Sequence, residues 1–129
     1  MKYLIPIFVV IDVGLPLYWV WVFIQIYQEG EFASDFGQLS YFLVNTSFLN
    51  IDMAIAVTGL ASIYAYLRHY AAWRVLAILS LAFTSFSGYF ALALWFVHHN
   101  MDPLWLVSNM FLAVYPMVFL FRFYRGKMA

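Results

Sequence analysis

Four long apolar runs occupy most of this chain and constrain its fold more than any other feature. They cover approximately residues 4–27, 44–67, 75–97 and 104–123. A helix that spans a membrane needs about 20 mostly apolar residues, and each run reaches that length. Hydrophobic residues make up 67% of the chain and charged residues only 9%, which excludes a soluble globular domain. The sequence therefore predicts an all-α polytopic membrane protein, with residues 1–129 forming one four-helix transmembrane bundle.

The basic residues predict how this bundle is oriented. All six lie at the chain ends or in the second connection, namely Lys2, Arg68, Arg74, Arg122, Arg125 and Lys127. The connections at 28–41 and 98–103 contain no Lys or Arg and hold the four acids outside the apolar runs. By the positive-inside rule, we expect a multi-pass protein of the cell (inner or plasma) membrane with cytoplasmic N- and C-termini. So one-sided a distribution argues against the antiparallel dimers of dual-topology transporters. The connection 28–41 is predicted to be a solvated loop, and a lid over the outer mouth of the bundle is the alternative.

Two carboxylates, Asp12 and Asp52, lie inside the first and second apolar runs. A carboxylate at bilayer depth is costly, and such groups are usually paired, solvated in a cavity or used in binding. At about 1.5 Å per helical residue, Asp12 lies roughly 15 Å from Lys2 and Asp52 roughly 24 Å from Arg68, so neither has a basic partner at its depth. We expect both to line a water-containing cavity that binds a cation or an amine. A proton shared between them would require the helices to offset a depth difference of roughly 9 Å.

Other polar residues recur at helical spacing on the apolar runs. Asn45, Asp52 and Gly59 share one face of the second run, and Thr84 and Ser87 belong to a stripe of small and hydroxyl residues in the third. Together with Asn109 of the fourth run, a candidate hydrogen-bond partner of Asp52, they give the predicted ligand-binding set: Asp52, Asp12, Asn109, Thr84, Ser87 and Asn45. Close packing of helices through small residues is the alternative explanation for the hydroxyl stripe, and interfacial water is the alternative for Asn45.

Aromatic and histidine residues give less functional information. The five tryptophans, Trp19, Trp21, Trp73, Trp95 and Trp105, include several near predicted span ends, where interfacial belts place them, and we do not interpret them as a ligand site. His69 is predicted on one side of the membrane and His98 and His99 on the other, which argues against paired haem ligands. No phosphate-binding loop, nucleophile elbow or zinc-protease motif is present. With no cysteine, zero net charge and no complete acid–base set, we expect no metal, cofactor or nucleic-acid partner, and enzymatic activity is the least favoured reading.

Segments from the whole chain resemble known families. The runs FVVIDVGLPLYW, NTSFLNIDMAIAVTGLASIYAYLRHYAAWR and LVSNMFLAVYP resemble the uncharacterised YvaD-like family of small bacterial four-helix membrane proteins. SFLNIDMAI, AWR and LVSNMFLAVYP are also similar in order and spacing to helices two to four of the EXPERA superfamily, which includes the sigma-2 receptor and the emopamil-binding sterol isomerase. That resemblance implies an occluded pocket for sterols and cationic amphiphiles, with Asp52 matching a pocket carboxylate. The isomerase's helix-two histidine and helix-three carboxylate are missing here, so sterol isomerisation is not implied.

These observations favour an integral membrane protein that binds a small hydrophobic or cationic molecule, such as a lipid, a sterol-like compound or an amine, in an acidic intramembrane pocket. Two alternatives stay open. One is a small transporter coupled to protons or cations, since Pro16 and Pro116 interrupt apolar runs. The other is a partner or immunity-type subunit that docks another membrane protein, or a homodimer, through its small-residue faces.

Overall fold

The computed structural model describes residues 2–29, 36–98 and 103–126, and this part of the chain consists of four α-helices without any strand. The helices are α1 (Leu4–Glu29), α2 (Phe36–Leu67), α3 (Trp73–His98) and α4 (Pro103–Tyr124). Each contains a stretch long and apolar enough to cross a membrane, which confirms the predicted all-α, four-helix class. Helix α2 begins at Phe36 rather than at residue 44, so the second half of the predicted loop is helical.

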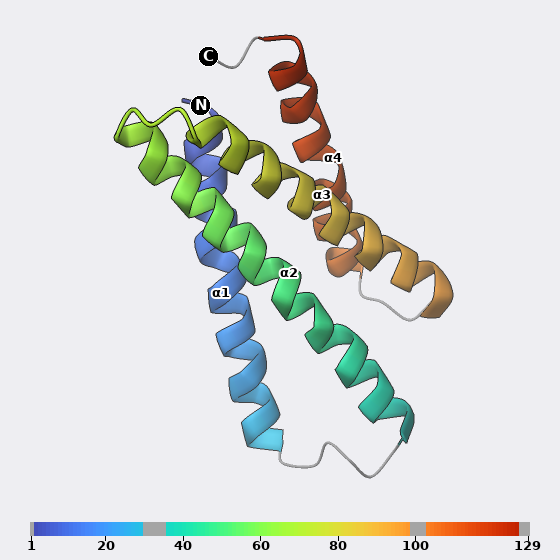
Figure 1. Ribbon diagram of the computed structural model, residues 1–129. Coiled ribbons are helices and arrows are strands. Elements are labelled where there is room, and N and C mark those ends of the chain that lie inside the picture. Colours follow the sequence, from blue (N-terminus) through green and yellow to red (C-terminus); the bar gives the residue numbers. More distant parts are fainter. Residues whose placement is uncertain (1, 30–35, 99–102, 127–129) are drawn as a thin grey trace.

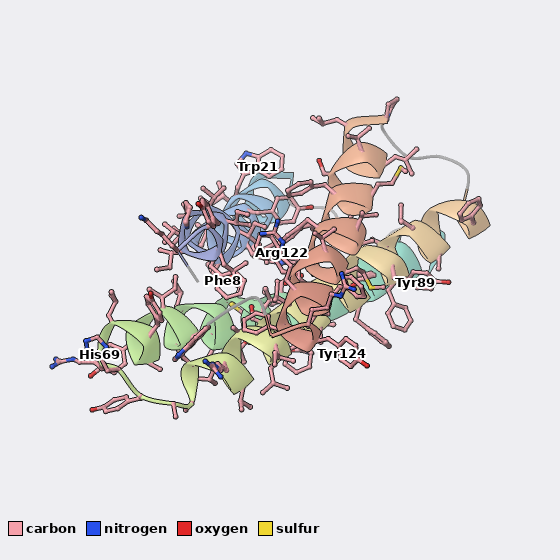
Figure 2. The ribbon with its side chains drawn as sticks, turned by 90° about the horizontal axis from the view of Figure 1, so that it is seen from above. Phe8, Trp21, His69, Tyr89, Arg122 and Tyr124 are labelled. Atoms are coloured by element: carbon pink, nitrogen blue, oxygen red, sulfur yellow. The ribbon has the colours of Figure 1, made fainter. Side chains whose placement is uncertain are left out.

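The helices form two layers of two (Figures 1 and 2). Helices α2 and α3 lie side by side, and α1 and α4 lie on the same face of that pair. Each helix packs against the next one in the chain, but within the described residues no Cα atom of α1 comes within 8 Å of one in α4. Both termini and the α2–α3 connection lie at one end of the molecule, which we call the terminal end. Helices α1 and α4 are therefore joined by side chains, since Leu4, Phe8 and Tyr115 belong to one buried cluster, and not by close approach of their backbones.

The tight connection between α2 and α3 is set by the last turn of α2. Helix α2 ends at Leu67, and His69 adopts a left-handed conformation with φ of 59°. The backbone N–H of Tyr70 donates to the carbonyl of Ala65 at 2.8 Å, and that of His69 donates to Tyr66 at 3.1 Å. This pair of bonds is a Schellman motif, which satisfies carbonyls that the helix itself leaves unpaired. It reverses the chain so that α3 can pack back along α2.

Small residues allow neighbouring helices to approach closely. A Cβ atom on Gly88 of α3 would lie 2.5 Å from the backbone nitrogen of Ala113 in α4. Serine hydroxyls of α3 also bridge to both neighbouring helices. Ser85 donates to the carbonyl of Ala113 in α4 at 2.9 Å, and Ser80 donates to that of Ile55 in α2 at 3.2 Å. Such contacts hold helices together where lipid provides no hydrophobic driving force. The stripe predicted on the third run is thus, at Ser80 and Gly88, a helix-packing surface.

A buried apolar cluster closes the terminal end. It brings together the start of α1, the end of α2, the start of α3 and the second half of α4, through Leu4, Phe8, Ala65, Trp73, Ala77, Leu81 and Tyr115. The Trp73 ring packs edge-on against Tyr66 and tilted against Phe123, with centroids 5.2 and 5.9 Å apart. Beyond this cluster the buried residues become polar. In the described chain, apolar side chains therefore fill the interior at the terminal end, and Asp12, Asp52, Thr84 and Ser87 are buried farther from that end.

Candidate functional site

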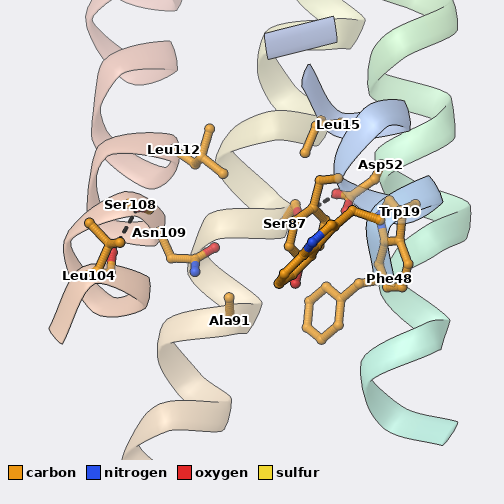
Figure 3. A pocket seen from close by; sticks show the side chains of 12 residues that line it. Leu15, Trp19, Phe48, Asp52, Ser87, Ala91, Leu104, Ser108, Asn109 and Leu112 are labelled. Carbon is orange, nitrogen blue, oxygen red and sulfur yellow. Dashed lines mark hydrogen bonds between the residues drawn. The ribbon is translucent and has the colours of Figure 1, made fainter. Parts of the chain in front are cut away.

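A cavity of about 490 Å³ lies beyond the apolar cluster, and all four helices contribute to its wall. Figure 3 shows it from close by, with α4 on one side and α2 on the other. The wall includes Leu15, Trp19 and Trp21 from α1, Phe48 and Asp52 from α2, Ser87 and Ala91 from α3, and Leu104, Asn109 and Leu112 from α4. Its volume falls within the range of about 300 to 1,000 Å³ that is typical of small-molecule sites.

Asp52 is the acidic group of this cavity, and two donors from different helices hold its carboxylate. The indole Nε1–H of Trp19 donates to Oδ2 at 2.7 Å, and the hydroxyl of Ser87 donates to Oδ1 at 3.2 Å. Only 7% of the Asp52 surface is exposed. A carboxylate can accept about four hydrogen bonds, so these donors leave acceptor capacity on both oxygens. Asp52 is thus fixed in position while it remains able to bind a further donor or a cation.

Trp19 is a cavity residue that the sequence did not single out among the five tryptophans. Only 3% of its surface is exposed and its indole donates to Asp52, so it does not belong to an interfacial belt. A buried Trp N–H generally needs an acceptor, and Asp52 provides one across the α1–α2 contact. The sequence could not predict this role, because it does not show that Trp19 of α1 lies opposite Asp52 of α2.

Asn109 and Ser87 both lie on the cavity wall, as the sequence predicted for a shared site. In Figure 3, Asn109 extends from α4 toward the cavity, on the side opposite Asp52 and Trp19. The donors that the structure gives to Asp52 are therefore Trp19 and Ser87, whereas the sequence had suggested Asn109. The cavity presents a carboxylate at one wall and an amide at the other, separated by apolar side chains.

Asp12 lies outside this cavity, since it is not among the residues that line the wall. Its carboxyl group is packed against Gly59 of α2, where a Cβ atom would overlap it, and only 1% of its surface is exposed. Asp12 and Trp19 are seven residues apart on α1, as are Gly59 and Asp52 on α2, which is about 10.5 Å along each helix. The two carboxyl groups therefore lie at different depths along the helices. The sequence predicted one cavity lined by both, whereas only Asp52 lines the cavity.

Thr84 is not among the residues that line the cavity. It is fully buried in α3, and its hydroxyl donates to the carbonyl of Ser80 at 2.7 Å. Thr84 also lies next to the hydroxyl of Tyr115 in α4, which is within electrostatic range of Asp12. Asn45 lies in α2, but its side chain is outside the described part of the structure. Of the predicted set, the cavity therefore brings together Asp52, Ser87 and Asn109.

The described residues contain no group of three or more His, Cys, Asp or Glu side chains that could hold a metal ion. His69 is exposed at the α2–α3 connection, at the terminal end. His98 ends α3, and neither its side chain nor His99 is among the described parts of the chain. The polar side chains on the cavity wall include the carboxylate of Asp52, the hydroxyl of Ser87 and the amide of Asn109.

Comparisons with known proteins identify a family without an assigned activity. The model of a family of unknown function, DUF5360, matches residues 4–129. The uncharacterized protein YvaD of Bacillus subtilis (strain 168) is 32% identical over 120 residues, which cover 93% of this chain and 90% of the relative. No solved structure matches the chain. The resemblance to the YvaD-like family is thereby confirmed, and the resemblance to the EXPERA superfamily stays a prediction.

Proposed function

The chain belongs to the family of unknown function DUF5360, and we propose from its geometry that it is an integral membrane protein whose cavity binds a small amphiphile. The ligand would have an apolar body and a cationic or hydrogen-bond-donating head that binds Asp52. The observation that carries this proposal is the position of Asp52, held by Trp19 and Ser87 at the wall of a largely apolar cavity. An amine or a hydroxyl group of a sterol-like or lipid molecule has the required chemistry.

Insertion in a membrane is supported by the outer surface of the four helices. Large apolar side chains are exposed on every helix, for example Leu17, Val57, Val75 and Val114. Soluble monomers rarely expose extended apolar surface, whereas lipid solvates it. The described basic residues lie on the terminal segments and beside the α2–α3 connection, all at the terminal end. By the positive-inside rule this end is cytoplasmic, and the cavity lies further toward the opposite leaflet.

The chemistry of the wall defines the class of ligand. Leu15, Phe48 and Leu112 offer apolar contact, and the free acceptor capacity of Asp52 is the strongest polar feature near them. In a site of low dielectric, an ammonium group gains far more from a carboxylate than it would in water. A neutral donor gains a charge-assisted hydrogen bond. We therefore expect cationic amphiphiles to bind more tightly than neutral analogues of the same shape.

We expect the ligand to enter the cavity from the lipid between the cavity-lining parts of α1 and α4. These helices have no Cα atoms within 8 Å of each other in the described residues. Two wall residues from these helices, Trp21 and Leu104, have 54% and 72% of their surface exposed, whereas Asp52 and Ser87 are buried. The cavity thus has an exposed apolar rim and a buried polar wall. An amphiphile dissolved in the bilayer would enter sideways with its head group leading toward Asp52.

A matched pair of ligands tests this function. Purified protein in detergent is titrated with a long-chain alkyl amine and with the corresponding alcohol, and thermal stability is recorded for wild type and Asp52→Asn. Binding to the folded state raises the melting temperature in proportion to the logarithm of ligand concentration above the dissociation constant. We expect the amine to stabilise wild type, and Asp52→Asn to weaken amine binding by about tenfold or more through loss of a charged partner.

Two controls separate binding at Asp52 from insertion of the amine into the micelle. Asp12→Asn removes a carboxyl group that lies outside the cavity, so it should weaken amine binding far less than Asp52→Asn does. Ala91→Phe fills the cavity wall without changing charge and should reduce binding of both the amine and the alcohol. Equal amine responses in wild type, Asp52→Asn and Ala91→Phe would refute the proposed cavity ligand.

A further inference from the structure

Asp12 forms a second polar centre with properties unlike those of Asp52. Neither of its carboxyl oxygens has a hydrogen-bond partner among the described residues, and only 1% of the residue surface is exposed. Its side chain rests on Gly59, where a Cβ at residue 59 would lie 3.0 Å from Oδ1. A carboxyl group removed from water without any donor is energetically unfavourable unless a positive charge accompanies it. The unpaired carboxyl group therefore requires a partner that the neighbouring side chains do not supply.

The groups around Asp12 are oxygen atoms rather than cations. The hydroxyl of Tyr115 on α4 is also buried, and its polar neighbour is the Thr84 hydroxyl of α3, whose oxygen can accept its hydrogen bond. Pro16 lies inside α1 and has no N–H to donate to the backbone carbonyl of Asp12, four residues before it. Carboxylate, hydroxyl and carbonyl oxygens suit a hard cation. Carbonyls released from helical bonding serve this purpose in membrane transporters.

We propose that Asp12, Thr84 and Tyr115 form a second binding centre, separate from the cavity, that takes up one positive charge as a proton or as a small monovalent cation such as Na⁺. The centre draws on three helices, with Gly59 of the fourth providing the surface against which the carboxyl group rests. Binding of the charge compensates the buried carboxylate, and the lone pairs of the Tyr115 hydroxyl can contribute a ligand if the charge is a cation. The proposal does not depend on a ligand at Asp52.

Few other charges compete for this role. Among the described residues, the titratable side chains nearest to Asp12 on the other helices are Tyr115 on α4 and Asp52 on α2. Asp52 lies about 10.5 Å along α2 from Gly59, which Asp12 contacts. Helix α3 contributes the neutral hydroxyl of Thr84 at this level. The described Lys and Arg residues lie at the terminal end, beyond the apolar cluster that contains Leu4 and Phe8. A response to pH or to Na⁺ that disappears in Asp12→Asn is therefore attributable to this centre.

The test uses the whole protein in detergent without added amphiphile. Melting temperature is measured in mixtures of NaCl and choline chloride at constant ionic strength, over a series of pH values. Wild type is compared with Asp12→Asn, with Asp52→Asn as the matched control on the other carboxyl group. We expect Asp52→Asn to keep the response to Na⁺ and Asp12→Asn to lose it. If the charge is a proton, Asp12→Asn should lose the part of the pH response that Asp52→Asn keeps. Stabilisation by Na⁺ over choline at fixed pH identifies a cation, and a response to pH alone identifies a proton.

Tyr115→Phe keeps the test decisive if Asp12→Asn does not fold. The phenylalanine ring preserves the stacking on Phe111, whose centroid lies 4.9 Å from that of Tyr115, and removes only the hydroxyl. We expect the Na⁺ concentration for half of the effect to rise by about tenfold or more, or the pH midpoint to shift if the charge is a proton. A wild-type protein that responds to neither Na⁺ nor pH, or variants that respond as wild type does, would overturn the proposal.

Discussion

Replacement of Gly59 by alanine tests the contact between α1 and α2 directly. A Cβ atom at residue 59 would lie 2.5 Å from Cγ of Asp12, whereas carbon atoms in good contact are about 3.5 to 4.0 Å apart. The carboxyl group or the helix must therefore move by about 1 to 1.5 Å. Overpacking of this kind usually costs about 1 to 3 kcal/mol, and we expect Gly59→Ala to lower the free energy of unfolding by that amount.

Gly14→Ala is the matched control, because it makes the same chemical change within α1 at a position with nothing within 4 Å. It should be neutral, or stabilising by up to about 1 kcal/mol through higher helix propensity. Unfolding of both variants by denaturing detergent in mixed micelles gives the comparison. Asp12→Ala completes a double-mutant cycle, in which alanine at residue 12 makes room for alanine at residue 59 and recovers about 1 to 3 kcal/mol. Equal stabilities of the two glycine variants, or an additive cycle, would refute the contact.

Three further substitutions test other parts of the structure. Gly88→Ala should destabilise more than Gly59→Ala, because its Cβ would meet backbone atoms of α4 that cannot rotate away; equal melting temperatures would contradict this. Trp19→Phe should leave Asp52 with one donor fewer and cost about 1.5 to 3 kcal/mol, so an unchanged unfolding free energy would argue against the indole–carboxylate bond. His69→Gly should be neutral or stabilise by up to about 1 kcal/mol, since glycine adopts the left-handed conformation without strain; a loss of stability would show that its side chain matters more than its backbone.

The fold was predictable to the extent that composition and spacing define it. Four apolar runs of sufficient length give four helices, and the residues that connect α2 to α3 are few enough to require a tight turn. The start of α2 was not predictable in this way. The segment FGQLSYFL mixes glycine and polar residues with aromatic ones, so hydropathy alone does not separate it from the loop before it. Its helical conformation extends α2 beyond the stretch that hydropathy identifies.

The site was predictable only in part, for a similar reason. Asp52, Ser87 and Asn109 stand out because polar residues are rare in apolar helices, and the cavity does bring them together. Trp19 and Tyr115 do not stand out, since aromatic residues make up 22% of the chain and any helix face presents several. Their roles depend on which helices are neighbours and how each is rotated about its axis. Helical spacing defines faces on one helix, but it does not pair a face with its partner.

The two carboxyl groups are linked through the helices that carry them. Asp12 and Trp19 lie two turns apart on α1, and their contacts on α2 are Gly59 and Asp52, also two turns apart. A change of charge at Asp12 that moves α1 against Gly59 therefore also moves the indole donor of Asp52. If binding at one centre changes the affinity of the other, the coupling must be equal in both directions. Amine affinity measured with and without Na⁺, or across pH, then decides between the two leading functions. A coupling that vanishes in Asp12→Asn favours a transporter, whereas independent centres favour a binding protein.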